Sequence, residues 1–414
     1  QLMINSIKFQ NFKSFKTLGL VLLALYPLAI ISGNLLINFF TILISISFFL
    51  NLKDNKKYFS DKSFYLLIFF FISLLINNIV SIDPQNSFPR TIKILFIIFF
   101  VIEIKRLVNI YKTNYLKYVF LSWSLILLFL SLDIIFETIF GHNIIGIKSY
   151  MPGRVASFFG DELVAGAFFH GFILFFFSYL INVNIKDNKL LFIIIAILVI
   201  SFLIGERSNF IKVFLSILIF SSLAIKIDYK LKTLSTLIIL VLIAIFINFN
   251  DFYKSRYYNQ IKTIFSINGY QEYIKKSQYG AHRDASIKIF NEYFLFGVGL
   301  KNYRLEVGKK KYENNDFLKT EFRVATHPHQ IHHELLSETG IFGYLCFLIF
   351  LVLSLYYGIK SYLINKNLYL LSSIIFILTS VLPILPSGSF FSTYTGGIFW
   401  LNYAIMLGFT NTKS

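Results

Sequence analysis

The feature that most constrains this chain is a succession of long apolar runs separated by short polar turns. A helix needs about 20 apolar residues to cross a bilayer, and a helix satisfies its own backbone groups there. Only 14% of the 414 residues are charged, whereas soluble domains have about a quarter. The sequence therefore predicts an all-α, polytopic membrane protein with about 12 transmembrane helices. The runs lie near 18–33, 35–51, 64–82, 91–104, 115–140, 163–183, 190–204, 210–225, 233–249, 341–358, 368–384 and 396–410.

The basic residues indicate how these runs are oriented. A net charge of +18 would suggest nucleic acid for a soluble domain, but here the lysines gather in alternate loops, which is typical of the cytoplasmic side of a membrane. We therefore expect a multi-pass protein of the inner (cytoplasmic) membrane with no nucleic-acid partner. The run Lys8, Lys13, Lys16 leads into the first span without a small-residue cleavage site, which predicts an uncleaved span. The cytoplasmic set is Lys53, Lys56, Lys57, Lys62, Lys105, Arg106, Lys112, Lys186, Lys189, Lys226, Lys230, Lys232, Lys360 and Lys366.

One loop on the opposite face is much longer than a connection requires. Residues 250–340 are rich in aromatic side chains and contain helix-like stretches, and long loops of this kind are usually functional. We expect three parts: an N-terminal transmembrane bundle of about nine spans over 1–249, a helical cap over 250–340, and a C-terminal bundle of about three spans over 341–414.

Three arginines lie in loops that the lysine pattern assigns to this opposite face. Arg90, Arg154 and Arg207 run against the positive-inside trend. For any one of them, contact with lipid headgroups or capping of a helix end is the better explanation. A purely structural membrane protein would nevertheless leave three such loops on one face unexplained.

Histidines cluster just before the tenth run. Four of the seven histidines fall between His327 and His333. His329 and His333 are four residues apart, as in metal-binding helices, but no further ligand set accompanies them, and the chain has one cysteine, so we expect no metal. Pro328 favours a helix start directly after it. His329 would then lie at a helix N-terminus, where the dipole lowers the pKa of an imidazole and keeps it neutral.

The histidine segment resembles the signature of the bacterial O-antigen ligase family, which also includes O-antigen polymerases. His329-Gln330 is followed after nine residues by Gly340 and Gly343, similar to the family's His-[Asn/Ser/Gln]-x9-Gly-x-x-Gly. Three further stretches are similar to family patterns. They are His282-Arg283-Asp284 with the later Phe296-Gly297-Val298-Gly299, Gly205-Glu206-Arg207-Ser208, and Gly153-Arg154-Val155-Ala156-Ser157-Phe158-Phe159-Gly160.

The resemblance implies a glycosyltransferase with a GT-C-like membrane fold and no cofactor. Its donor would be a glycan on undecaprenyl diphosphate, and its acceptor a hydroxyl of lipid A-core or of another lipid-linked glycan. We favour the lipid A-core acceptor, and hence a ligase of lipopolysaccharide biosynthesis, over a repeat-unit polymerase. The active site would face the periplasm.

The chemistry of the matched residues assigns their roles. His329 would accept the proton of the acceptor hydroxyl as general base. Arg207 and Arg283 would bind the diphosphate bidentately and stabilise its charge as it leaves. The product would be inverted at the anomeric carbon. We expect Arg154, Arg90, Asp161, His332 and His333 to contact substrate.

Several alternatives remain open from sequence. Asp161 and Glu162 fit a structural ion pair with Arg154 as well as a role in binding. His170, inside a span, is explained equally by function and by a hydrogen bond to a neighbouring helix. A polysaccharide transporter or flippase is the alternative from another class. Transporters usually have paired broken helices near the midplane, whereas here the polar residues concentrate in an outer loop.

Overall fold

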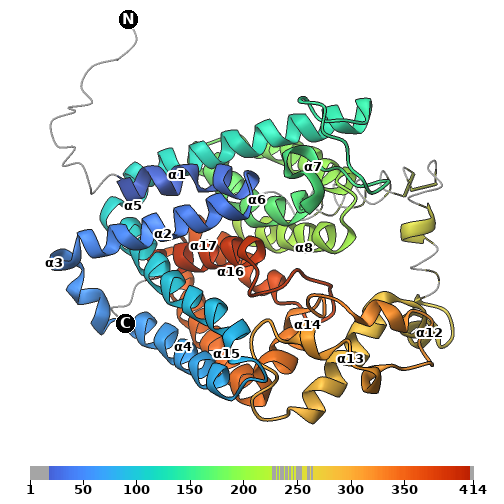
Figure 1. Ribbon diagram of the computed structural model, residues 1–414. Coiled ribbons are helices and arrows are strands. Elements are labelled where there is room, and N and C mark those ends of the chain that lie inside the picture. Colours follow the sequence, from blue (N-terminus) through green and yellow to red (C-terminus); the bar gives the residue numbers. More distant parts are fainter. Residues whose placement is uncertain are drawn as a thin grey trace, which may run out of the picture.

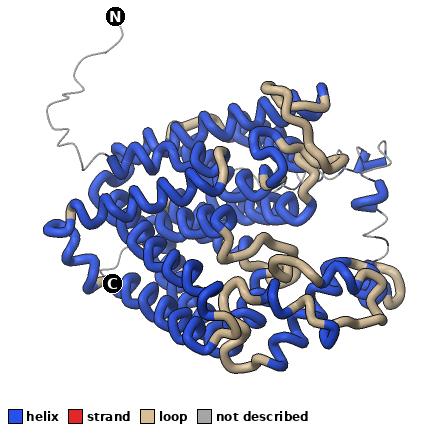
Figure 2. Tube along the Cα trace, viewed as in Figure 1, coloured by secondary structure: helices blue, strands red, loops and turns tan. Residues whose placement is uncertain are grey.

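The computed structural model describes residues 18–225, 254–258 and 264–410, with scattered single residues between 230 and 262. Helices and the loops between them make up this part of the chain, and no strand occurs in it (Figure 2). The predicted run at 233–249 falls mostly outside the described residues. The chain is thus a helical membrane protein, as the apolar runs predict.

The apolar helices follow the predicted runs closely. Each of the other eleven runs coincides with a helix or part of one. Their bounds are α1 Leu18–Ile31, α2 Asn34–Leu50, α4 Lys62–Val80, α5 Pro84–Phe140, α6 Ala165–Asn182, α7 Asp187–Leu203, α8 Arg207–Ala224, α15 Ile331–Asn365, α16 Leu368–Ser380 and α17 Thr393–Phe409. Short elements join some of them: α3 Leu52–Asn55, η2 Lys56–Ser60 and η3 Ser157–Glu162.

Length and hydropathy identify five of the described helices as candidate membrane spans. They are Lys62–Val80, Tyr115–Phe140, Ala165–Asn182, Arg207–Ala224 and Ile331–Asn365. Helices α1, α2 and α16 are apolar but shorter. The described residues therefore support a multi-pass membrane protein, while the predicted number of spans is not established by them.

Helix α5 differs from the prediction of two spans joined by a loop. It continues without interruption from Pro84 to Phe140, and Figure 1 shows its two halves running in different directions. The expected connection at 105–114 is helical, in part because its own charges are satisfied within the protein. Buried Arg106 donates to Glu103 at 2.7 Å, and buried Lys105 donates to Asp61 at 2.7 Å.

Local caps explain where several helices begin and end. Asp61 accepts from the Ser63 backbone N–H at 2.9 Å at the start of α4, and Asp83 accepts from the Asn86 N–H at 3.0 Å at the start of α5. Such side-chain caps satisfy amide groups that the first turn leaves unpaired. Gly141 ends α5 in the left-handed conformation with φ of 75°, which glycine adopts without steric cost.

Helix α17 lies at the centre of the bundle. It packs against α1, α2, α5, α6, α15 and α16, and nearly all of its side chains are buried. Aromatic rings fill the space around it. Phe350 of α15 lies 5.9 Å from Trp400 and 5.0 Å from Tyr403, measured between ring centroids. This packing holds α15, and therefore the residues at its N-terminal end, against the bundle.

The segment before α15 forms a small helical unit beside the bundle (Figure 1). Its elements are a π-helical turn at Lys254–Tyr258, α12 Gly269–Lys276, α13 Gln278–Glu292, α14 Tyr303–Glu306, η5 Lys310–Tyr312 and η6 Thr320–Arg323. We call residues 264–330 the cap. It has its own apolar core of Ala285, Ile289, Val298, Tyr303, Val307 and Tyr312. The helical content predicted for this stretch is thus observed.

Candidate active site

The histidine segment joins the start of α15 through an N-cap residue and a turn with a strained backbone. Gln330 is the N-cap residue, and its side chain accepts from the His333 backbone N–H at 2.8 Å. His329 precedes it with φ of 54°, a left-handed conformation that is uncommon for residues other than glycine. The His329 carbonyl accepts from the Ser387 N–H at 2.9 Å. The hydrogen bond from the loop before α17 therefore stabilises this strained backbone conformation. Strained residues of this kind concentrate at functional sites.

Three imidazole rings converge at this turn. The His329 ring lies 4.1 Å from that of His327 and 4.9 Å from that of His282, between centroids. His282 comes from α13, whereas His327 and His329 lie in the turn before α15. Nδ1 of His282 and Nε2 of His327 are buried without a hydrogen-bond partner. Two buried and unpaired ring nitrogens therefore lie beside the half-buried His329.

The surroundings keep these imidazoles neutral. Burial and, to a lesser extent, the neighbouring His329 together lower the pKa of His282 to about 4 and that of His327 to about 3. Burial also lowers the pKa of His329. Loss of water, rather than the predicted helix dipole, is therefore the cause, because desolvation disfavours the charged ring. A neutral imidazole can accept a proton.

The other two predicted histidines have different surroundings. His332 uses both ring nitrogens, one 3.0 Å from the Tyr344 hydroxyl and the other 2.7 Å from the Val381 carbonyl. Its ring therefore joins α15 to the end of α16. His333 is half-buried, and Arg283 of α13 is close enough to act on it electrostatically.

The two glycine motifs recognised in the sequence form one interlocked structure. Gly340 breaks α15 with φ of 64° and ψ of −172°. On either side of the break, the Ile341 N–H donates to Phe294 at 2.8 Å, and the Gly299 N–H donates to Glu338 at 2.8 Å. A β-carbon on Gly340 would lie 2.4 Å from the Leu295 carbonyl oxygen. The turn after α13 is thus fixed to α15, which sets the position of His282 relative to His329.

The Arg154 and Arg207 loops also lie side by side. A β-carbon on Gly205 would lie 2.0 Å from the Gly153 carbonyl oxygen. Glu206 lies 3.3 Å from the Arg154 guanidinium and accepts from the Gly166 N–H at 3.0 Å. Arg154 is therefore paired with Glu206, and not with Asp161 or Glu162 as one sequence alternative proposed. This pairing holds the turn from which Arg207 begins α8.

A chain of contacts links α8 with the histidines. Lys212 of α8 donates to the Pro386 carbonyl at 3.3 Å, and the next residue, Ser387, binds His329. Five helical residues, a rise of about 7.5 Å, separate Arg207 from Lys212. The start of α8 and the histidine turn therefore share one face of the bundle.

Comparison with known protein families finds a match over part of the chain. Residues 190–348 match a family model described as O-Antigen ligase. The predicted O-antigen ligase relationship is confirmed over these residues. No curated protein matches the chain.

The O-antigen ligase segment contains the principal candidate residues, Arg207, Arg283 and His329. Arg283 lies on α13, which begins five residues earlier at Gln278, and its side chain is exposed beside buried His282. Arg90 and Arg154 lie outside this segment.

Arg90 and Asp161 differ in how the fold places them. Arg90 lies within α5 rather than in a loop, because α5 begins at Pro84, and it donates to the Phe391 carbonyl at 2.5 Å. Asp161 is exposed near the end of η3. His170 is buried and lies 2.8 Å from the Thr379 hydroxyl of α16, so the hydrogen bond between helices is the alternative that the structure supports.

Sequence reasoning missed three charged residues near the O-antigen ligase histidines. Glu334 and Glu338 lie one turn apart on α15 and are buried. Glu334 accepts from the Phe390 N–H at 2.7 Å and from the Ser389 hydroxyl. Exposed Arg304 of α14 lowers the pKa of His327 and interacts electrostatically with Glu338. Two glutamates spaced i, i+4 after a histidine cluster were a visible signal for such a buried pair.

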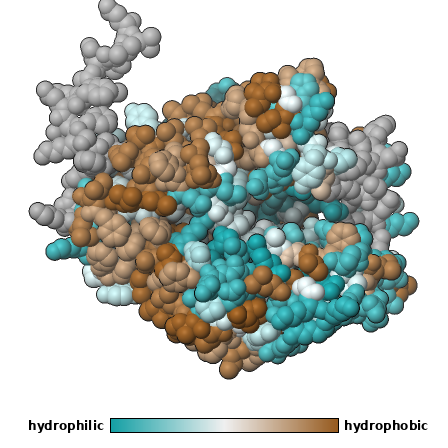
Figure 3. Space-filling view, in the orientation of Figure 1, coloured by the Kyte–Doolittle hydropathy of each residue, from teal (hydrophilic) through white to brown (hydrophobic). Residues whose placement is uncertain are grey.

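The surface around these residues is polar and concave. Figure 3 shows hydrophilic residues across the middle of the molecule and over the cap, with a hollow between the cap and the bundle. Hydrophobic residues cover the outer helices around α1 and α2. The groups of histidines, cysteines and carboxylates among the described residues include none with the geometry of a metal site.

Proposed function

We propose that this protein transfers a glycan from undecaprenyl diphosphate to an acceptor hydroxyl at the periplasmic face of the inner membrane, with inversion and without a metal. The observation that carries this proposal is the convergence of three neutral histidines: His282 from α13, and His327 and His329 from the turn before α15. The family relationship supports lipid-linked glycans as substrates.

His329 is the proposed general base. Its ring makes no hydrogen bond among the described side chains, and its backbone carbonyl accepts from the Ser387 N–H. The acceptor hydroxyl gives its proton to this imidazole as its oxygen attacks the anomeric carbon. His282 and His327, which stay neutral, keep positive charge away from the base until the proton arrives.

Arg207 and Arg283 are the proposed ligands of the leaving group. As the bond between the anomeric carbon and the diphosphate oxygen breaks, its electron pair stays on the diphosphate. Guanidinium groups stabilise that growing charge more in the transition state than in the ground state. Two such groups supply charge neutralisation without a divalent cation. Arg154 supports Arg207 indirectly, because it holds Glu206.

Lipid A-core is the proposed acceptor. The test is a transfer assay with the purified full chain, an undecaprenyl-diphosphate glycan, and either lipid A-core or a second lipid-linked glycan as acceptor. Formation of a glycosylated lipid A-core supports the ligase. Lengthening of the lipid-linked glycan alone would replace the ligase by a polymerase, and the absence of both products would reject transfer by this chain.

A further inference from the structure

The loop that joins α16 to α17, residues 381–392, lies against the first turn of α15. The His332 ring lies 2.7 Å from the Val381 carbonyl, and the Ser387 N–H donates to the His329 carbonyl at 2.9 Å. A left-handed backbone such as that of His329 persists only where its surroundings hold it. The position of this α16–α17 loop therefore helps to determine the position of the proposed base.

Glu334 attaches the middle of the α16–α17 loop to α15. This glutamate is buried, with 1% of the residue exposed. One of its carboxylate oxygens accepts from the Ser389 hydroxyl, and the other accepts from the Phe390 N–H at 2.7 Å. Ser387, which binds the His329 carbonyl, lies two residues before Ser389. Both oxygens of a buried carboxyl group are thus used to hold the segment that holds His329.

Two further helices bind the α16–α17 loop on either side of these contacts. Lys212 of α8 donates to the Pro386 carbonyl at 3.3 Å, and Arg90 of α5 donates to the Phe391 carbonyl at 2.5 Å. Together with Glu334, ionisable side chains from three helices therefore bind successive parts of the loop. Connecting loops are usually more mobile than the helices that they join, so this one is held to an unusual degree.

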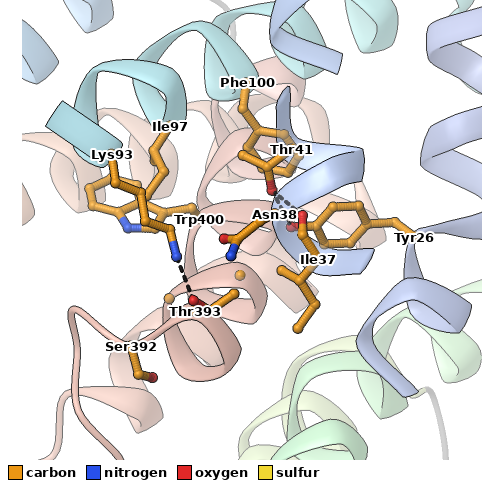
Figure 4. A pocket seen from close by; sticks show the side chains of 12 residues that line it. Tyr26, Ile37, Asn38, Thr41, Lys93, Ile97, Phe100, Ser392, Thr393 and Trp400 are labelled. Carbon is orange, nitrogen blue, oxygen red and sulfur yellow. Dashed lines mark hydrogen bonds between the residues drawn. The ribbon is translucent and has the colours of Figure 1, made fainter. Parts of the chain in front are cut away.

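The end of the loop is fixed where α17 begins. Ser392 is the N-cap residue of α17 and accepts from the Thr395 N–H at 3.2 Å. Lys93 of α5 donates to the Thr393 hydroxyl at 2.7 Å, beside Ser392 (Figure 4). The last residue of the loop is therefore restrained independently of α15, so the contacts with α15 decide where its middle lies.

We infer that Glu334 is a positioning residue of the transfer reaction and acts on His329 through the α16–α17 loop. The inference rests on the proposed role of His329 as the base. Glu334 is not itself a catalytic residue, because it is buried and both of its oxygens bind the loop. A displacement of about 1 Å at a reacting group can cost about 100-fold in rate. Loss of this support should therefore slow transfer without removing a group that touches substrate.

The first test is the transfer assay with the purified full chain and separate determination of kcat and KM. Glu334→Ala removes both acceptors and should lower kcat by about 10–100-fold, with little change in KM for either substrate. Glu334→Gln should stay within about threefold of wild type, because its amide oxygen can accept from Phe390 while its amide nitrogen donates to the Ser389 hydroxyl. Exposed Glu321→Gln is the matched control. Equal losses for Glu334→Ala and Glu334→Gln would assign Glu334 a role through its proton or charge and overturn the inference.

A double variant distinguishes positioning from a general loss of structure. In His329→Ala protein, Glu334→Ala should cause little further loss, because a residue that acts through the base has no effect once the base is absent. Losses that multiply would contradict the inference. Should Glu334→Ala not fold, Ser389→Ala removes one of the two donors, and a wild-type kcat in that variant would also overturn the inference. Its control is Ser380→Ala, whose hydroxyl bonds within its own helix.

Hydrogen exchange separates a failure of this inference from a failure of the proposed function. Amides of residues 381–392, measured by mass spectrometry in detergent, should exchange about tenfold faster or more in Glu334→Ala than in wild type, and at the wild-type rate in Glu334→Gln. Unchanged exchange in Glu334→Ala would overturn the inference. Faster exchange together with an inactive wild type would reject the proposed function and retain the support of the loop by Glu334.

Discussion

At the residue scale, the position of His329 depends on contacts from three directions. Gln330 caps α15, Ser387 binds the His329 carbonyl, and the tilted rings of His282 and His327 lie against its ring. These neighbours exclude water from the His329 imidazole and leave its ring nitrogens without a hydrogen bond among the described residues. A base in such a place is neutral and oriented before the acceptor binds.

Replacement of His329 tests that role. His329→Ala should lower the transfer rate by about 10²–10⁴-fold, the usual contribution of a general base, with donor binding little changed. His142→Ala, in the loop after α5, is the matched control and should leave the rate near that of wild type. Transfer at an undiminished rate by folded His329→Ala protein would exclude the histidine as base.

The pH dependence follows from the sign of the pKa shift. Burial lowers the pKa of His329 below the ordinary value near 6.5. The ring is therefore neutral above its lowered pKa, and protonation removes the base only as the pH falls through that value. Transfer should persist at pH 6.5, where half of ordinary imidazoles are charged, and decline at lower pH. EDTA should not change the rate. A rate already halved at pH 6.5, or restored after EDTA by one divalent ion, would contradict this assignment.

The arginines are tested by keeping their charge. Arg207→Lys and Arg283→Lys retain a cation but lose the planar fork, so each should lower transfer by about tenfold or more. Arg90→Lys should have a smaller effect, because Arg90 makes one hydrogen bond to a backbone carbonyl, which an ammonium can also make. Equal rates for all three variants would argue against bidentate phosphate contact.

At the scale of elements, the break in α15 determines how the cap meets the bundle. The turn after α13 hydrogen-bonds to α15 on both sides of Gly340, and Asn77 of α4 donates to the carbonyls of Phe296 and Glu338 at 2.5 Å and 2.9 Å. Three segments distant in sequence therefore meet at one glycine. These contacts therefore determine how α13, which carries His282, lies relative to the start of α15.

Gly340→Ala should destabilise the protein. The backbone angles at Gly340 are accessible almost only to glycine, and the new methyl group would press on Leu295. The expected cost is about 1–3 kcal/mol, measured as a lower midpoint of thermal unfolding in detergent. Gly308→Ala is the control, since a methyl group there meets no atom within 4 Å. An unchanged midpoint for Gly340→Ala would show that the backbone around Gly340 accommodates a methyl group without cost.

At the scale of the whole molecule, the polar hollow lies beside the cap, and the helices away from the cap are largely apolar on the face that Figure 3 shows. The lysine-rich turn around α3 and η2 lies away from the cap (Figure 1). We propose that the side with the cap faces the periplasm, following the distribution of the lysines.

Labelling with an impermeant thiol reagent tests this orientation. A cysteine in place of Lys310, which is exposed in the cap, should react from outside in spheroplasts, and one in place of exposed Lys57 should not. The native Cys346 is buried, so the wild type provides the background. The reverse labelling pattern would invert the topology and place the site in the cytoplasm.

The sequence by itself determined the helices, because burial in lipid requires local runs of apolar residues and each run appears in one stretch of chain. Short motifs similar to those of a known family also predicted roles for His329, Arg207 and Arg283, which stay predictions. Tertiary structure alone decided that His282 joins His327 and His329, that Glu206 pairs with Arg154, and that Glu334 binds the loop before α17. These contacts join residues far apart in sequence. The periodicity of apolar residues within one helix does not indicate which other helices pack against it. The continuity of α5 escaped prediction for a related reason: buried partners satisfy the charges at Lys105 and Arg106, which the sequence presents as a polar loop.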